Sequence, residues 1–223
     1  MYGICKLIAR VLLRLLWGIR VVGLENIPSS GPVVVTSNHR SRLDPPLLGA
    51  VVPREAAYAA KKELFAVPGL GRLIRSLNAI PVNRANLSVT TLRQFEKWLR
   101  SGRVLIFFPE GTRSKDGRLG RAKIGVGMML ARQDVPVLPV FIEGTGSVLR
   151  NIFRWGRVRV TFGRPYTLPA ETWQSEARTR EDYRKIADLV MARIRELAED
   201  AEGLERETDI SEGSAARQAG SRR

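Results

Sequence analysis

The chain has little cysteine or histidine and few aromatic residues. One cysteine, Cys5, excludes an internal disulfide, and one histidine, His39, excludes a metal site built from several histidines. Because no cluster of cysteines replaces them, the sequence predicts neither a metal nor a bound cofactor. Aromatic residues make up 7% of the chain, which argues against a surface that stacks nucleic-acid bases on exposed rings.

Acidic residues are too few to balance the basic ones. The chain has 37 Lys and Arg against 22 Asp and Glu, a formal net charge of +15, although acids outnumber bases from Glu199 to the end. A surface this basic favours an anionic partner, such as nucleic acid, an anionic membrane or a phosphorylated substrate. For the charge taken alone, plain solubility is the alternative.

The amino terminus has no apolar run long enough to cross a membrane, which needs ~20 mostly apolar residues. At helical spacing, its large aliphatic side chains gather on one side and its basic side chains on the other. The aliphatic set is Ile4, Leu7, Ile8, Val11, Leu12, Leu15 and Ile19, and the basic set is Lys6, Arg10, Arg14 and Arg20. A cleaved signal peptide would need an uninterrupted apolar run and a small-residue cleavage site. We therefore predict that residues 1–22 form an amphipathic helix in the headgroup layer. The alternative is a helix packed on the core with its arginines in water.

Strand-like and helix-like segments alternate after this helix. The predicted strands are 33–36, 79–82, 103–108, 137–142 and 158–162, and the predicted helices begin at Pro45 or cover 71–77, 88–100, 121–133 and 181–197. Residues 55–60 fit either structure. This alternation predicts an α/β fold: a single domain, residues 23–199, with a mixed, largely parallel sheet flanked by helices. The polar segment 200–223 is predicted to be a disordered tail.

The segment NHRSRLD places His39 directly after the first strand, where α/β folds bind ligands. A neutral imidazole can accept the proton of an attacking hydroxyl, and a buried carboxylate can fix its tautomer. Asp44 follows five residues later, so the two side chains can meet only if a turn brings Asp44 back to His39. The alternatives are that Asp44 caps the following helix and that His39 is an ordinary loop residue.

Three further segments follow strands or form them. In FPEGTRS, Gly111 permits close approach of a ligand, and Arg113 offers a planar fork suited to phosphate. The segment IPVNR ends in Arg84. Each of these two segments could equally be a simple turn or strand end with an exposed arginine. The segment VPVLPV contains two prolines, which predicts an edge strand, a strand start or a bulge.

These segments resemble the glycerolipid acyltransferase family, the lysophosphatidic acid acyltransferases. NHRSRLD resembles the family block NHxSxxD, IPVNR is similar to the block that ends in Arg, and FPEGTRS matches its block letter for letter. VPVLPV looks like the fourth block, and all four stand in the family's order. The text AKKELF and VVGLENIP is also similar. Two positions depart from the family: Asn78 stands where Gly is frequent, and Asn83 stands where an acidic residue is common.

The resemblance implies that His39 is the general base and Asp44 its partner. It also implies that the acceptor site is lined by Glu110, Gly111, Thr112 and Arg113, and that the phosphate is held by Arg84 and Lys61. The acceptor would be a lysophospholipid, 1-acylglycerol 3-phosphate, acylated on its 2-hydroxyl to give phosphatidic acid. The donor would be acyl-CoA or acyl carrier protein, and the enzyme would lie on the cytoplasmic face of the cell membrane.

Two other functions stay open at this point. One is an acyltransferase of the same fold that acts on another lysolipid or lipid hydroxyl. The more distant one is a non-catalytic basic protein that binds membranes or nucleic acid, which predicts no role for His39. No G-x-S-x-G motif surrounds Ser41, so we expect direct transfer without a covalent intermediate.

Overall fold

The structure is a computed structural model that describes residues 2–83, 87–114, 116–147, 151–152, 155–169 and 179–220. The elements follow one another as α1 (Tyr2–Trp17), β1 (Arg20–Val22), η1 (Leu24–Asn26), β2 (Val33–Ser37), α2 (Asp44–Val51), β3 (Ala56–Lys61), η2 (Lys62–Ala66), α3 (Leu70–Ser76), β4 (Ala79–Val82), α4 (Val89–Arg100), β5 (Val104–Phe107), α5 (Ile124–Leu130), β6 (Val137–Glu143), η3 (Thr145–Ser147), β7 (Arg159–Phe162) and α7 (Arg180–Gly220). The segment at 55–60, for which strand and helix were both open, is strand β3.

The seven strands form one sheet in the order β1-β7-β6-β2-β5-β3-β4. Every pair is parallel except β6 with β7. The predicted α/β fold with a mixed, largely parallel sheet is therefore confirmed. Strand β2 lies in the middle between β5 and β6, and all five of its side chains are buried. Its run of valines fits a strand that is covered on both faces.

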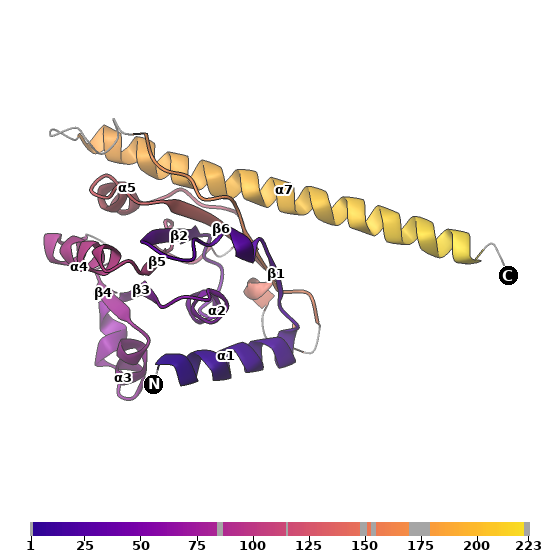
Figure 1. The fold of residues 1–223 in the computed structure, drawn as a ribbon, viewed down its shortest axis with the longest axis horizontal. Helices are drawn as coiled ribbons and strands as arrows, with labels where there is room; N and C mark the ends of the chain where they lie inside the picture. The colour runs from indigo at the N-terminus through magenta and orange to yellow at the C-terminus, as the bar shows by residue number, and fades with distance from the viewer. Residues whose placement is uncertain are drawn as a thin grey trace.

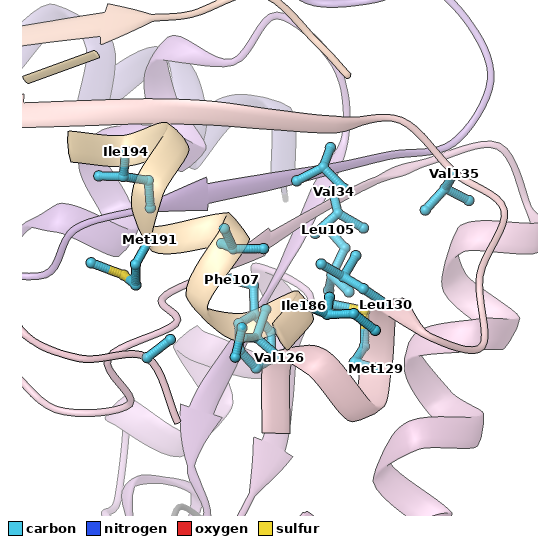
Figure 2. Close-up of a cluster of buried hydrophobic side chains, with 14 of the residues drawn as sticks. Val34, Leu105, Phe107, Val126, Met129, Leu130, Val135, Ile186, Met191 and Ile194 are labelled. Carbon is cyan, nitrogen blue, oxygen red and sulfur yellow. The ribbon is translucent and has the colours of Figure 1, made fainter. Parts of the chain in front are cut away.

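Helices cover both faces of the sheet (Figure 1). On one face, α4, α5 and α7 pack against the strands, and Figure 2 shows Ile186 and Met191 of α7 near Val126 and Met129 of α5. On the other face, Trp17 of α1, Leu47 of α2 and Ile74 of α3 belong to a second buried cluster. The sheet edge where β2, β5 and β3 end is thus left between two layers of helices.

Helix α1 packs on the domain with the side that carries Lys6, Leu13, Leu16 and Trp17. Lys6 Nζ donates to the Arg54 carbonyl oxygen at 2.8 Å, and the Arg10 guanidinium donates twice to the Ala50 carbonyl oxygen, at 3.1 and 3.0 Å. Trp17 is buried, and Gly18, in the left-handed region at φ 52°, follows the last residue of the helix.

Six of the seven predicted aliphatic side chains of α1 are instead exposed: Ile4, Leu7, Ile8, Val11, Leu12 and Leu15. Helix α1 also packs on the core through Leu13, Leu16 and Trp17 and leaves Arg14 and Arg20 exposed, so packing on the core and contact with a membrane both stay open. Among the described residues, no helix is long and apolar enough to cross a membrane.

Two helices differ in length from the prediction. Helix α5 is shorter than 121–133, because the Lys123 amide donates to the Pro109 carbonyl oxygen at 2.8 Å and residues 121–123 belong to that loop. Helix α7 continues to Gly220, where we expected it to end at Leu197. The added segment is rich in Ala and Glu, which favour helix, and contains no proline.

Of the two prolines in VPVLPV, Pro136 directly precedes β6, in agreement with the expected strand start, whereas Pro139 lies inside this interior strand. Val137 exchanges two hydrogen bonds with Tyr166, and the Pro139 carbonyl oxygen accepts from the Gly163 amide at 2.9 Å. Backbone groups of residues 137 and 139 face the same side, where β7 has already ended. The donor that Pro139 lacks is therefore not needed by a neighbouring strand.

Candidate active site

Two neighbouring parallel strands bring the His39 segment and the FPEGTRS segment together. Thr36 of β2 lies beside Phe107 of β5 in register, so both strands end at the same edge of the sheet. The chain then continues into Asn38–Asp44 on one side and Phe108–Ser114 on the other. This is the edge where parallel α/β sheets bind ligands.

His39 and Asp44 form a buried pair at this edge. His39 Nδ1 lies 2.9 Å from Asp44 Oδ2, and the two residues are 4% and 0% exposed. The same oxygen accepts the backbone N–H groups of Arg40 and Ser41, each at 2.7 Å. The required turn is therefore present: the carboxylate points back to the loop, where three donors fix its position.

The helix-cap alternative for Asp44 does not hold. Leu43 occupies the N-cap position of α2, and Asp44, the first helical residue, directs its carboxylate away from the helix. The Ser41 side chain accepts from the Leu43 amide at 3.2 Å, so that hydroxyl is engaged within the turn. With Nδ1–H donated to Asp44, Nε2 is the imidazole nitrogen left to accept a proton.

The FPEGTRS segment holds the backbone of His39 from both sides. Glu110 Oε1 accepts the His39 N–H at 3.2 Å, and the Ser114 N–H donates to the His39 carbonyl oxygen at 2.8 Å. The Phe108 ring lies over the imidazole, with ring centroids 4.4 Å apart. Burial raises the pKa of Glu110, although N–H groups of His39 and Gly120 act in the opposite direction.

Asn38 fixes the segment to the neighbouring strand. Its side-chain amide donates to the Ile142 carbonyl oxygen at 2.9 Å, and its Oδ1 accepts the Ile142 N–H at 2.8 Å. The Asn38 side chain thus continues the pairing of β2 with β6 after β2 has ended. His39 leaves the sheet at a defined point as a result.

A largely apolar cavity of about 280 Å³ lies beside His39, between the sheet and α5. Its lining is His39, Pro45, Ala59, Val82, Leu87, Phe107, Phe108, Pro109, Gly111, Lys123, Ile124, Gly125, Val126, Met128 and Arg184. The Arg184 guanidinium is held by the Ala122 carbonyl oxygen at 2.6 Å. The histidine therefore faces a space suited to hydrocarbon, with Lys123 and Arg184 as cations in the lining.

The residues predicted to line the acceptor site occupy different positions relative to the cavity. Gly111 lines the cavity in the left-handed region at φ 66°, and its N–H donates to the Phe108 carbonyl oxygen at 3.0 Å. Glu110 contacts backbone instead, while Thr112 and Arg113 are exposed on the loop. Lys61, also exposed, ends β3 with its Nζ 3.8 Å from Glu63. Arg84 lies outside the described residues.

Asn78 departs from the family's frequent glycine, and the backbone explains why asparagine fits. Its φ of 62° makes it the non-glycine residue with left-handed backbone in the described part of the chain. Asparagine tolerates this region better than most residues. Its amide also donates to Glu55 Oε1 at 3.0 Å.

A family model described as Acyltransferase matches residues 18–143, which contain the His39 and FPEGTRS segments. The chain belongs to the acyltransferase family. A solved acyltransferase, the 1-acyl-sn-glycerophosphate (LPA) acyltransferase PlsC from Thermotoga maritima, is similar with a TM-score of 0.64 and 32% identity, over 87% of this chain and 79% of that one.

Curated relatives agree with this membership. The 1-acyl-sn-glycerol-3-phosphate acyltransferase of Bacillus subtilis is 30% identical over 74% of this chain and 82% of its own length. A chloroplastic 1-acyl-sn-glycerol-3-phosphate acyltransferase of Arabidopsis thaliana is 35% identical over 79% of this chain and 52% of its own. The chain thus spans about half the length of the plant relatives it matches.

Several side chains of this acyltransferase site were not assigned a role by sequence reasoning. Phe108 and Asn38 adjoin the recognised blocks, so their positions beside His39 carried a usable signal. Lys123 directly precedes α5, and Arg184 belongs to α7. Arg184 in particular carries no local signal, because only the packing of α7 on α5 brings it to the cavity.

Proposed function

We propose that this chain transfers a fatty acyl group from a thioester donor to the 2-hydroxyl of 1-acylglycerol 3-phosphate, giving phosphatidic acid. The observation that carries the proposal is the buried His39–Asp44 pair beside an apolar cavity. The similar proteins are named as 1-acylglycerol-phosphate acyltransferases, which supports the choice of acceptor.

The reaction needs a base and then an acid, and His39 can serve as both. Nε2 accepts the proton of the acceptor hydroxyl as its oxygen attacks the thioester carbonyl carbon. When the carbon–sulfur bond breaks, the thiolate leaves and takes that proton from the imidazolium. Asp44 holds the ring and stabilises its positive charge while the tetrahedral species exists. A base placed in this way contributes ~10²–10⁴-fold to the rate.

The donor acyl chain and the acceptor phosphate would bind in regions of different polarity. The cavity beside His39 has apolar walls, which suit an acyl chain whose carbonyl carbon sits at the imidazole. The acceptor phosphate would be bound by Arg113, with Arg84 and Lys61 as further cations, because a guanidinium can bind phosphate through two charge-assisted hydrogen bonds. Either acyl-CoA or acyl carrier protein fits as donor.

Membrane attachment on the cytoplasmic face is part of the proposal. Helix α1 presents its exposed aliphatic side chains away from the domain, and Arg14 and Arg20 are exposed near its end. Burial of one such aliphatic side chain contributes ~1.5–3 kcal/mol. Each base near an anionic leaflet adds ~1 kcal/mol. Several such contacts support reversible attachment after the loss of motional freedom is discounted.

The decisive experiment is acyl transfer by the purified chain from labelled acyl-CoA and acyl carrier protein to acceptors in lipid vesicles. We expect lysophosphatidic acid to be acylated and His39→Ala to abolish the reaction. Transfer to another lysolipid but not to lysophosphatidic acid would establish the same-fold alternative. Absence of transfer to every acceptor would favour a non-catalytic membrane-binding protein.

A further inference from the structure

Exposed aliphatic side chains gather in two parts of the described chain. Of fourteen exposed large hydrophobic residues, six belong to α1 and four to η2–α3. The η2–α3 set is Leu64, Val67, Leu70 and Leu73, with exposed fractions of 37%, 45%, 38% and 44%. An exposed apolar set of this kind on a short segment indicates contact with something other than water.

The η2–α3 segment needs little of its surface for folding. Between residues 62 and 76, only Gly71 and Ile74 are buried, and Ile74 joins the cluster under α1 and α2. A Cβ at Gly71 would lie 2.3 Å from the Phe65 carbonyl oxygen, so the chain is closely packed there. The four aliphatic side chains take no part in these anchoring contacts and are exposed.

Helix α1 and η2–α3 belong to the same layer. Trp17 of α1 and Ile74 of α3 are both buried in the same hydrophobic cluster on one face of the sheet. Since both elements turn their inner sides to that face, their outer sides point the same way. Figure 1 shows α1 and α3 together on the lower side of the molecule, opposite α7. Their exposed aliphatic side chains therefore lie on one side of the protein, which we call the outer face.

The charged residues beside the exposed aliphatic side chains indicate what kind of partner the outer face contacts. The exposed charged residues of the η2–α3 region are four cations and one acid: Lys61, Lys62, Arg72, Arg75 and Glu63. The Arg75 guanidinium lies over the Phe65 ring, 5.3 Å from its centre, so a cation and an apolar ring are adjacent in this segment. Aliphatic side chains with Lys and Arg beside them are the composition of elements that lie in an anionic membrane interface.

The η2–α3 segment also lies near the active-site edge. Segment η2 begins directly after β3, and β3, β5 and β2 are parallel neighbours that end at the edge where His39 lies. We infer that η2–α3 is a second membrane-contact element that, together with α1, sets the active-site edge against an anionic leaflet. The inference rests on the proposed function in one respect, because that leaflet would supply the acceptor lipid.

A fluorescent label tests the contact directly. Leu70→Cys and Val89→Cys would be prepared in a Cys5→Ser background and labelled with an environment-sensitive nitrobenzoxadiazole dye. Val89 is a matched control: it is an exposed aliphatic residue, at 58%, on α4, which packs on the opposite face of the sheet. On vesicles of mixed phosphatidylcholine and phosphatidylglycerol, we expect a blue shift and shielding from iodide for the label at position 70 only.

A second measurement uses the unlabelled full chain. Leu70→Gln with Leu73→Gln should weaken partition into these vesicles about tenfold or more, because two aliphatic side chains no longer enter the interface. Val89→Gln should leave partition unchanged. The double variant should also lose activity on vesicle-embedded acceptor while it keeps its melting temperature and its activity on a short-chain, water-soluble acceptor.

Two results would overturn the inference. One is a label at position 70 that stays accessible to iodide on vesicles, with unchanged partition of the double variant. The other is protection of that label without vesicles, together with a dimer that the double variant abolishes, which would make the outer face a protein interface. Failure of the wild-type chain to acylate lysophosphatidic acid would instead sink the proposed function, while a label inserted in the bilayer would still establish the contact.

Discussion

The catalytic edge and the outer face of α1 and η2–α3 differ in the residue types that they carry and in how far those side chains are exposed. At the edge, the His39 ring, its backbone groups and Asp44 Oδ2 each have a hydrogen-bond partner and are buried. On the outer face, aliphatic side chains are exposed without an apolar neighbour to cover them. Buried hydrogen bonds fix geometry, whereas uncovered apolar surface provides binding energy for a partner. Substitutions in one region should therefore change turnover, and substitutions in the other should change attachment.

The largest effect is expected from the pair itself. His39→Ala should lower acyl transfer by at least ~10²-fold, because no other histidine can act as the base. Asp44→Asn should also remove most activity, because it can leave the imidazole in the wrong tautomer. Turnover is measured with labelled donor, and vesicle partition serves as the control that should not change. Retention of more than about a tenth of wild-type turnover by His39→Ala would contradict its role as base.

Substitution of Arg113 on the exposed FPEGTRS loop should change the KM for the acceptor but not the KM for the donor. Arg113→Ala should raise the KM for lysophosphatidic acid by roughly 10–100-fold, the equivalent of a lost charge-assisted hydrogen bond. The KM for the donor should stay the same, since the guanidinium is assigned to the acceptor phosphate. Monoacylglycerol, which lacks the phosphate, is the matched acceptor. An equal loss on both acceptors would show that Arg113 does not bind phosphate.

Substitutions on the two sides of helix α1 should affect membrane attachment and folding stability separately. Leu7→Gln with Leu15→Gln should weaken partition into anionic vesicles about tenfold or more, because both side chains are exposed and available to lipid. The melting temperature should not change. Trp17→Ala is the contrasting variant: its side chain is buried, so it should cost ~3–5 kcal/mol of unfolding free energy. Loss of stability in the leucine variant would mean that this side of α1 packs on the protein.

A smaller effect is expected at Glu110, which positions His39 through its backbone. Glu110→Gln should lower kcat about tenfold, because the amide has one acceptor oxygen and an NH2 donor where the carboxylate accepts the N–H groups of His39 and Gly120. The KM for the acceptor should stay constant. A raised KM with constant kcat would instead favour the direct acceptor contact that the family resemblance implies.

The smallest effect concerns pH. Burial raises the pKa of Glu110 above its ordinary value of 4.5, so the folded state holds this proton more tightly than the unfolded state. Its contribution to stability is therefore present below the unfolded pKa and is lost as pH rises through the raised pKa. Melting curves of wild type and Glu110→Gln, compared from about pH 4.5 upward, should show the wild type losing stability relative to the variant. A constant difference across that range would mean that the pKa is not raised.

Sequence alone was enough for the fold class and for the position of the His39 and FPEGTRS segments after strand ends. Valine-rich β2, the apolar strand β5 and the helices between them predicted a parallel sheet. Parallel neighbours end at one edge, so His39 and the FPEGTRS segment could be expected to meet. These features follow from local patterns, because residue periodicity and strand–helix alternation are written in consecutive residues.

Only the tertiary structure decided where several side chains point. The five-residue spacing left open whether the Asp44 carboxylate caps a helix or turns back to His39. The turn at 39–43 brings it back to His39. Glu110 was expected at the acceptor, yet it accepts the His39 N–H from a strand away. Helical spacing did not specify which side of α1 meets the domain. Lys6 and Arg10 bind its carbonyl groups and Trp17 packs on its core, whereas six of the seven predicted aliphatic side chains stay exposed. Each of these outcomes depends on partners that are distant in the chain or on the path of a turn, which the identity and spacing of nearby residues do not specify.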